Sequence, residues 1–166
     1  MTKEKEGTMK RTVVFLALLS LWAVAPATAA EKAPPAPSAK DKCPVCGMFV
    51  APYPNWLGVV VYKDGGRSYF DGPKDLFTYY FAPEKYGSAR KRADIAGIYV
   101  TDYYSVSAID GRKAFYVIGS DVRGPMGNEL VPFAKKAAAD GFLKDHHGKK
   151  VLSFDEITPA TLKSLE

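Results

Sequence analysis

The segment CPVCGM, residues 43–48, contains the only two cysteines of the 166-residue chain. Such a pair can serve as a redox switch, a structural disulfide, half of a zinc site or a cradle for a softer metal. Each of these roles requires different residues elsewhere in the sequence. The remainder of the chain therefore tests the four roles in turn.

Residues 1–30 have the pattern of a secretory signal peptide. Lys10 and Arg11 precede an almost unbroken apolar run from Thr12 to Ala25, and the small residues of PATAA close it. The apolar run is shorter than the ~20 residues that a transmembrane helix needs. We therefore expect the chain to be exported.

Residues 31–42, EKAPPAPSAKDK, form a spacer that is too poor in bulky apolar residues to build a core. The folded part is then expected at 43–166, long enough for one compact domain or two small halves. The leader holds four of the 23 basic and two of the 18 acidic residues, which leaves a net charge of +3. Since these charges are scattered, we expect no nucleic-acid partner.

The pattern of the folded part predicts an α+β domain with antiparallel strands. Strands are expected at LGVVVY and SYF, which flank an Asp-Gly-Gly turn, and at IAGIYVTDYY and KAFYVIGS. A helix is expected within NELVPFAKKAAADGFLKDHHG, where apolar residues recur on one face. Hairpins beside helices favour this class over a doubly wound parallel sheet.

Two stretches share the same order of elements. GGRSYFDGPKDLFTYYF (65–81) and HGKKVLSFDEITPATLKSL (147–165) each contain a strand, a Phe-Asp pair and a helical pattern. Asp71 and Asp155 are placed to cap or precede a helix. We therefore predict two similar small halves, at about 43–95 and 96–166.

For most roles of the cysteine pair, the sequence lacks the other residues that the role requires. A thioredoxin-like dithiol belongs at the start of a helix, but Pro52 and Pro54 follow this pair. Zinc normally takes four ligands, and the chain has no second Cys-x-x-Cys. Iron–sulfur clusters need four cysteines, and haem attachment needs histidine where Gly47 stands. A structural disulfide is the remaining alternative, although closing so short a loop adds little to the stability of the fold.

Soft-metal binding accounts for the methionines as well. Thiolate and thioether sulfur favour Cu(I), for which two or three ligands suffice. Met48 follows the pair directly, and Met126 lies in the turn RGPMGNE rather than on the apolar face of an element. His146 and His147 are further candidate ligands, with an ordinary surface role as their alternative.

Several segments resemble the NosL family, the accessory proteins of nitrous oxide reductase. They are CPVCGM, YFDGPKDLF, AFYVIGSDVRGPMGNELVPFA and HHGKKVLSFDEI. The resemblance implies a periplasmic Cu(I)-binding protein of two α+β units, with a fold related to part of organomercurial lyase. It also implies Cys43, Cys46, Met48 and Met126 as ligands. Family members are commonly lipoproteins, but the exit ATAAEK has no cysteine, so we expect a free periplasmic form.

The function expected from these observations is that of a metallochaperone without catalytic activity. It would deliver Cu(I) to an exported copper enzyme, with nitrous oxide reductase as the client and a membrane-bound maturation complex as a further partner. The alternatives are a thiol–disulfide oxidoreductase and an organomercurial-lyase-like enzyme. The lyase needs a carboxyl group beside the thiols, and the nearest in sequence is Asp41, in the spacer.

Overall fold

The computed structural model describes residues 33–166, together with residue 2. The predicted signal peptide lies outside the described residues apart from residue 2. Within these residues the strands are β1 (Gly58–Tyr62), β2 (Arg67–Phe70), β3 (Ile95–Thr101), β4 (Ala108–Asp110), β5 (Phe115–Ile118), β6 (Arg123–Gly124), β7 (Gly127–Asn128), β8 (Val131–Phe133) and β9 (Lys150–Ser153). The α-helices are α1 (Pro73–Phe81), α2 (Lys136–Asp145) and α3 (Pro159–Lys163). Short 3-10 turns are η1 (Pro54–Trp56), η2 (Pro83–Tyr86), η3 (Arg92–Asp94) and η4 (Phe154–Glu156).

The strands form three antiparallel sheets. The largest has the order β2-β1-β3-β4, the second has the order β8-β5-β9, and β6 and β7 form a small hairpin. The predicted α+β class with antiparallel pairing is confirmed, including the hairpin between β1 and β2. The expected boundary near residue 95 falls at the start of β3, which pairs back onto β1. The division into two similar halves stays a prediction.

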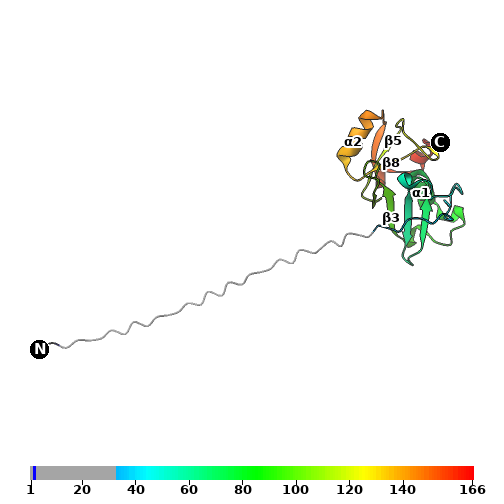
Figure 1. Cartoon of the computed structure of the whole chain (residues 1–166), viewed down its shortest axis with the longest axis horizontal. Coiled ribbons are helices and arrows are strands. Elements are labelled where there is room, and N and C mark those ends of the chain that lie inside the picture. Colours follow the sequence, from blue (N-terminus) through cyan, green and yellow to red (C-terminus); the bar gives the residue numbers. More distant parts are fainter. Residues whose placement is uncertain (1, 3–32) are drawn as a thin grey trace. The chain divides into compact units, whose positions relative to one another are not determined.

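The helices cover the sheets with apolar faces. Helix α2 packs on β5, β8 and β9, as Figure 1 shows beside the labels β5 and β8. Helix α1 packs on β1, β2 and α3. Its Phe77 also meets Tyr116 of β5, with ring centroids 5.2 Å apart, so α1 contacts both large sheets. Within residues 33–166, no helix is long and apolar enough to cross a membrane.

The helix predicted across residues 128–148 begins later than the sequence pattern indicates. Residues Val131–Phe133 are buried and form strand β8, and α2 begins only at Lys136. Pro132 explains the difference, because proline is disfavoured inside a helix and tolerated on an edge strand. Strand β8 is an edge strand of its sheet, and Tyr116 lies opposite Pro132.

Candidate metal centre

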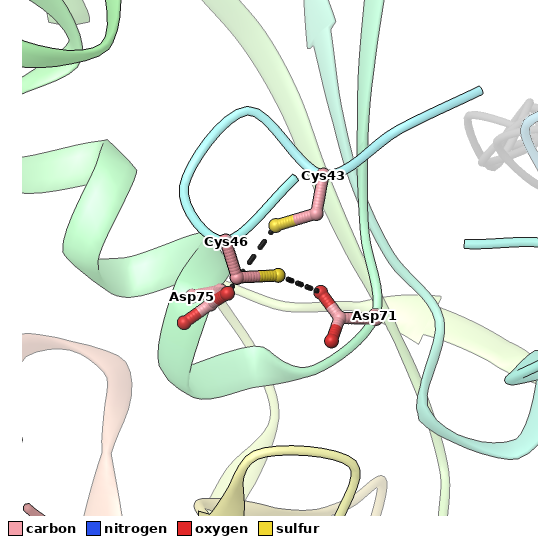
Figure 2. A group of neighbouring side chains, drawn as sticks. All are labelled: Cys43, Cys46, Asp71 and Asp75. Atoms are coloured by element: carbon pink, nitrogen blue, oxygen red, sulfur yellow. Dashed lines mark hydrogen bonds between the residues drawn. The ribbon is translucent and has the colours of Figure 1, made fainter. Parts of the chain in front are cut away.

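The cysteines lie on a closed loop at the start of the folded part. An antiparallel bridge pairs Lys42 with Phe49, and the Cys43 amide donates to the Met48 carbonyl at 2.8 Å. Gly47 closes the turn with a backbone φ of +79°, which residues other than glycine rarely adopt. Its amide donates to the Cys43 carbonyl. The loop thereby directs both thiols toward the junction of β2 and α1 (Figure 2).

Two aspartates from this junction face the thiols. Asp71 follows the last residue of β2, and Asp75 lies in the first turn of α1. The Cys43 thiol donates to Oδ2 of Asp75 at 3.3 Å, and the Cys46 thiol donates to Oδ1 of Asp71 at 3.2 Å. One ligand atom from each of the four residues lies within 4.8 Å of the others. The fold therefore builds a compact cluster of two sulfur and two oxygen donors.

The cluster is largely withdrawn from water. Cys43, Asp71 and Asp75 are buried, whereas Cys46 is half-buried and faces the surface in part. Burial raises the pKa of the Cys43 thiol strongly and that of Cys46 to about 12, and burial also raises the pKa of Asp75. The metal-free cysteines are thus neutral thiols that donate to carboxylates. Redox-active dithiols have lowered pKa values instead, which argues against an oxidoreductase.

Asp71 has an unused ligand atom. Its side chain is fully buried, and Oδ2 has no hydrogen-bond partner among the described residues. A buried carboxylate oxygen without a partner destabilises the fold, so such an atom calls for an explanation. A cation bound between the thiolates and this carboxylate would supply the missing partner. The donor set therefore fits a soft metal ion that accepts sulfur ligands.

Each of the two methionines belongs to a segment that adjoins this cluster. Met48 is half-buried at the end of the cysteine loop. Met126 lies at the tip of the β6–β7 hairpin and is 42% exposed. The Lys74 ammonium, one residue before Asp75, donates to the Met126 carbonyl at 2.7 Å. This contact ties the Met126 turn to the segment that carries the aspartates.

The histidines belong to a different part of the molecule. Nδ1 of His146 lies 3.0 Å from Oδ1 of Asp121, and its ring stacks on Phe142 with centroids 4.3 Å apart. His147 follows with φ of +52°, the left-handed conformation that commonly ends a helix. In residues 33–166, the cluster of His, Cys, Asp and Glu ligand atoms around the cysteines includes neither histidine.

Sequence reasoning missed both aspartates of the cluster. Asp71 precedes α1 as predicted, but the N-cap of the helix is Gly72, and the Asp71 side chain meets Cys46. Asp41 is the nearest carboxylate in sequence, but it accepts from the Ser38 amide, and the carboxylates that contact the thiols are Asp71 and Asp75. The i, i+4 spacing of the two aspartates was the available signal, since it allows both to face one point at a helix start.

Comparisons with known proteins identify relatives of this chain. The family model of NosL matches residues 34–162. The copper-binding lipoprotein NosL of Stutzerimonas stutzeri is 34% identical over 131 residues, a match that covers 74% of this chain and 65% of the relative. The chain therefore spans less than two thirds of that relative's length.

Two solved structures are also similar. The crystal structure of the copper chaperone NosL from Shewanella denitrificans superposes with a TM-score of 0.63 at 28% identity, covering 76% of this chain and 99% of that one. The solution structure of apo-NosL from Achromobacter cycloclastes gives a TM-score of 0.46 at 29% identity, covering 63% and 87%. The first superposition therefore covers nearly the whole of the Shewanella chain.

Proposed function

The chain belongs to the NosL family, and from this premise we propose that it is a metallochaperone that binds Cu(I) and delivers it to an exported copper enzyme. The observation that carries the proposal is the largely buried cluster of Cys43, Cys46, Asp71 and Asp75. Two relatives are named a copper-binding lipoprotein and a copper chaperone, which supports copper as the cargo.

The proposed ligands are the two cysteine sulfurs, completed by the thioethers of Met48 and Met126. When copper binds, each thiol must lose its proton. The carboxylates of Asp75 and Asp71, which accept hydrogen bonds from the two thiols, can accept these protons. Asp71 also offers its unpartnered oxygen to the cation. His146 and His147 are left out of this ligand set because neither belongs to the cluster of ligand atoms around the cysteines, and His146 contacts Asp121 and Phe142.

Release requires that a partner reach the ion. Cys46 is half-buried and Met126 is exposed, so the proposed ligand set is more open on their side than at the buried Cys43. A partner could displace the weak thioether first and then take the ion from the thiolates. We propose nitrous oxide reductase as the client and the periplasm as the place of delivery, with a membrane-bound maturation complex as a further partner.

The test is an anaerobic titration of the reduced protein with Cu(I) against a competing chelator. We expect tight binding of one ion per chain, and a large loss of affinity when both cysteines are replaced by serine. The Cys43→Ser/Cys46→Ser protein must keep the circular dichroism spectrum of the parent. Equal copper binding by the folded double variant and the parent would overturn the proposal.

A second candidate function is cleavage of a carbon–mercury bond. The observation that favours it is a carboxyl group beside each thiol, the element that this chemistry needs. An organomercury cation would bind both sulfurs as the thiols lose two protons. One proton would pass through an aspartate to the departing carbon, the carbon–mercury bond would break, and the second proton would go to solvent. Mercury(II) would stay on the two thiolates and a hydrocarbon would leave.

This candidate is tested by incubating the reduced protein with a phenylmercury salt and measuring benzene by gas chromatography. Benzene formation that disappears in Asp71→Asn or Asp75→Asn would support cleavage. Stable binding of phenylmercury without benzene would leave the chaperone as the function of the site.

A further inference from the structure

Glu129 is a buried carboxylate outside the cysteine cluster. Its side chain is 3% exposed, and Oε1 accepts from the Lys74 amide at 2.5 Å and from the Leu130 amide at 2.9 Å. Oε2 has no partner among the residues that the structure describes. Burial raises the pKa of Glu129 to about 8. A buried acid with one unpartnered oxygen lowers stability, so its presence calls for a role that an apolar residue could not fill.

The Lys74 contact places Glu129 at the start of α1. Gly72 is the N-cap and Pro73 is the first helical residue, which has no amide hydrogen to offer. The Lys74 amide is therefore the first free donor of the helix, and it is satisfied by a carboxylate from a distant segment. Glu129 thus caps the N-terminus of α1 in place of a side chain at Gly72.

The same side chain lies against the hairpin that carries Met126. Glu129 directly follows β7, and its carbon chain packs on Gly124 of β6, where an added Cβ would come within 2.9 Å of Cγ. On the other side, an added Cβ at Gly72 would collide with Oε2. Two glycines therefore leave just enough room for Glu129 between the hairpin and the helix start.

A second contact holds the tip of the hairpin. Gly124 pairs with Gly127 across a two-residue turn of Pro125 and Met126, and the Lys74 ammonium donates to the Met126 carbonyl at 2.7 Å. Lys74 thus uses its amide on Glu129, at the base of the hairpin, and its ammonium on Met126, at the tip. The next residue along α1 is Asp75, which accepts from Cys43.

We propose that Glu129 is a positioning residue that fixes the Met126 hairpin against the helix start that carries the thiol-binding aspartates. The inference rests on the proposed function, in which Met126 supplies a thioether to the metal site. A flexible surface turn would lose conformational entropy each time it brought Met126 to the ion, and anchoring the hairpin beforehand removes that loss. A helix cap alone would not require the carboxylate to come from the end of this hairpin.

The position of Met126 can be measured without copper, by NMR of protein labelled with carbon-13 at the methionine methyl groups. In Glu129→Ala we expect the Met126 methyl signal to shift toward its value in a flexible peptide and to sharpen, while Met48 stays closer to the parent. Glu129→Asp, whose shorter carboxylate cannot reach the Lys74 amide in the same way, carries the test should Glu129→Ala fail to fold. Glu156→Gln removes a carboxylate that accepts from Ser153 at another helix start and is the matched control.

Copper titration then separates positioning from a general loss of stability. Glu129→Ala should weaken Cu(I) binding about tenfold in the parent, as expected for a residue that supports a ligand. The same substitution should have no further effect in a Met126→Leu background, because its influence passes through Met126. Equal losses in both backgrounds, or an unchanged Met126 methyl signal in the folded Glu129 variants, would overturn the inference. A shifted methyl signal with copper affinity insensitive to Met126→Leu would uphold the anchoring by Glu129 and remove Met126 from the proposed ligands.

Discussion

The thiol of Cys46 donates a 3.2 Å hydrogen bond to Oδ1 of Asp71, a residue that lies 25 positions further along the chain. Asp71 is fully buried, and its second oxygen finds no partner within the described residues. The contact joins a donor that must lose its proton to an acceptor that can take it. It also leaves one oxygen of Asp71 without a partner, so this side chain offers both the proton acceptor and the metal ligand that the proposed function requires.

The first prediction concerns this free oxygen. Asp71→Asn keeps an acceptor for the Cys46 thiol but replaces the negative charge and turns the unpartnered oxygen into a donor. We expect folding to survive and Cu(I) affinity to fall about tenfold, the loss typical of a group that supports metal ligands. Competition titration measures the change. Asp121→Asn, which alters the partner of His146, is the control and should bind as the parent does. Equal affinity in all three proteins would remove Asp71 from the site.

The second prediction concerns Met126, which is 42% exposed at a hairpin tip. Met126→Leu keeps size and apolarity, and swaps of this kind usually change stability by less than about 1.5 kcal/mol. We expect a folded protein whose Cu(I) affinity is measurably lower than that of the parent but far higher than that of Cys43→Ser/Cys46→Ser. If the folded leucine variant binds as tightly as the parent, Met126 is only a turn residue.

Local patterns in the sequence predicted much of the fold. The Asp-Gly-Gly turn placed the β1–β2 hairpin, and the Phe-Asp pairs marked where helical segments follow strands. The apolar periodicity of residues 130–138 led to the wrong prediction of a helix at residues 130–134, because Leu130, Phe133 and Ala134 fit one helical face. Pairing of Val131–Phe133 with β5 is a long-range interaction, and it overrides the local preference.

Local sequence patterns predicted only half of the candidate site. Cys43 and Cys46 form a local motif, so their chemistry can be read without a fold. Asp71 and Asp75 acquire their role only because β2 ends beside the cysteine loop, 25 and 32 residues from their thiol partners. Glu129 is still harder to recognise, since its function depends on two glycines and an amide from three separate segments.

The third prediction concerns oxidation of the cysteine pair. Joining the two sulfurs in a disulfide removes both thiolates, so the oxidised protein should retain no Cu(I) through them. Copper retained after gel filtration under nitrogen should therefore differ sharply between the reduced and oxidised forms. Similar retention in both forms would mean that other atoms bind the ion.

The fourth prediction is that Cu(I) affinity rises with pH. Burial raises the pKa of Cys46 to about 12 and that of Cys43 in the same direction, so both thiols hold their protons at neutral pH. Copper must displace these protons, and the apparent affinity should grow about tenfold per pH unit for each proton that reaches solvent. Asp75, whose pKa burial also raises, can retain one of them and reduce the slope. Titrations between about pH 6 and 8 measure the slope, and a flat profile would contradict thiol ligation.

The last prediction links Glu129 to the pH dependence of folding. Burial raises its pKa from 4.5 to about 8, so the folded state holds the proton more tightly than the unfolded chain does. The stabilising contribution of the protonated acid is complete below pH 4.5 and is lost progressively as the pH rises to about 8. Glutamine has a similar shape and does not titrate. The stability of Glu129→Gln relative to the parent should therefore increase across this range, by at most about 5 kcal/mol.

Urea unfolding of both proteins at several pH values measures this difference, because Cys43, Cys46 and Asp75 titrate in both and their effects cancel. Glu156→Gln supplies a control of opposite sign. The amide and hydroxyl of Ser153 lower the pKa of the exposed Glu156 carboxylate, so its contribution is present above the unfolded value and fades as the pH falls. A parent-to-Glu129→Gln difference that stays constant from pH 4.5 to 8 would show that the carboxylate is ionised in the folded protein throughout, and the argument for a buried neutral acid beneath the Met126 hairpin would fail.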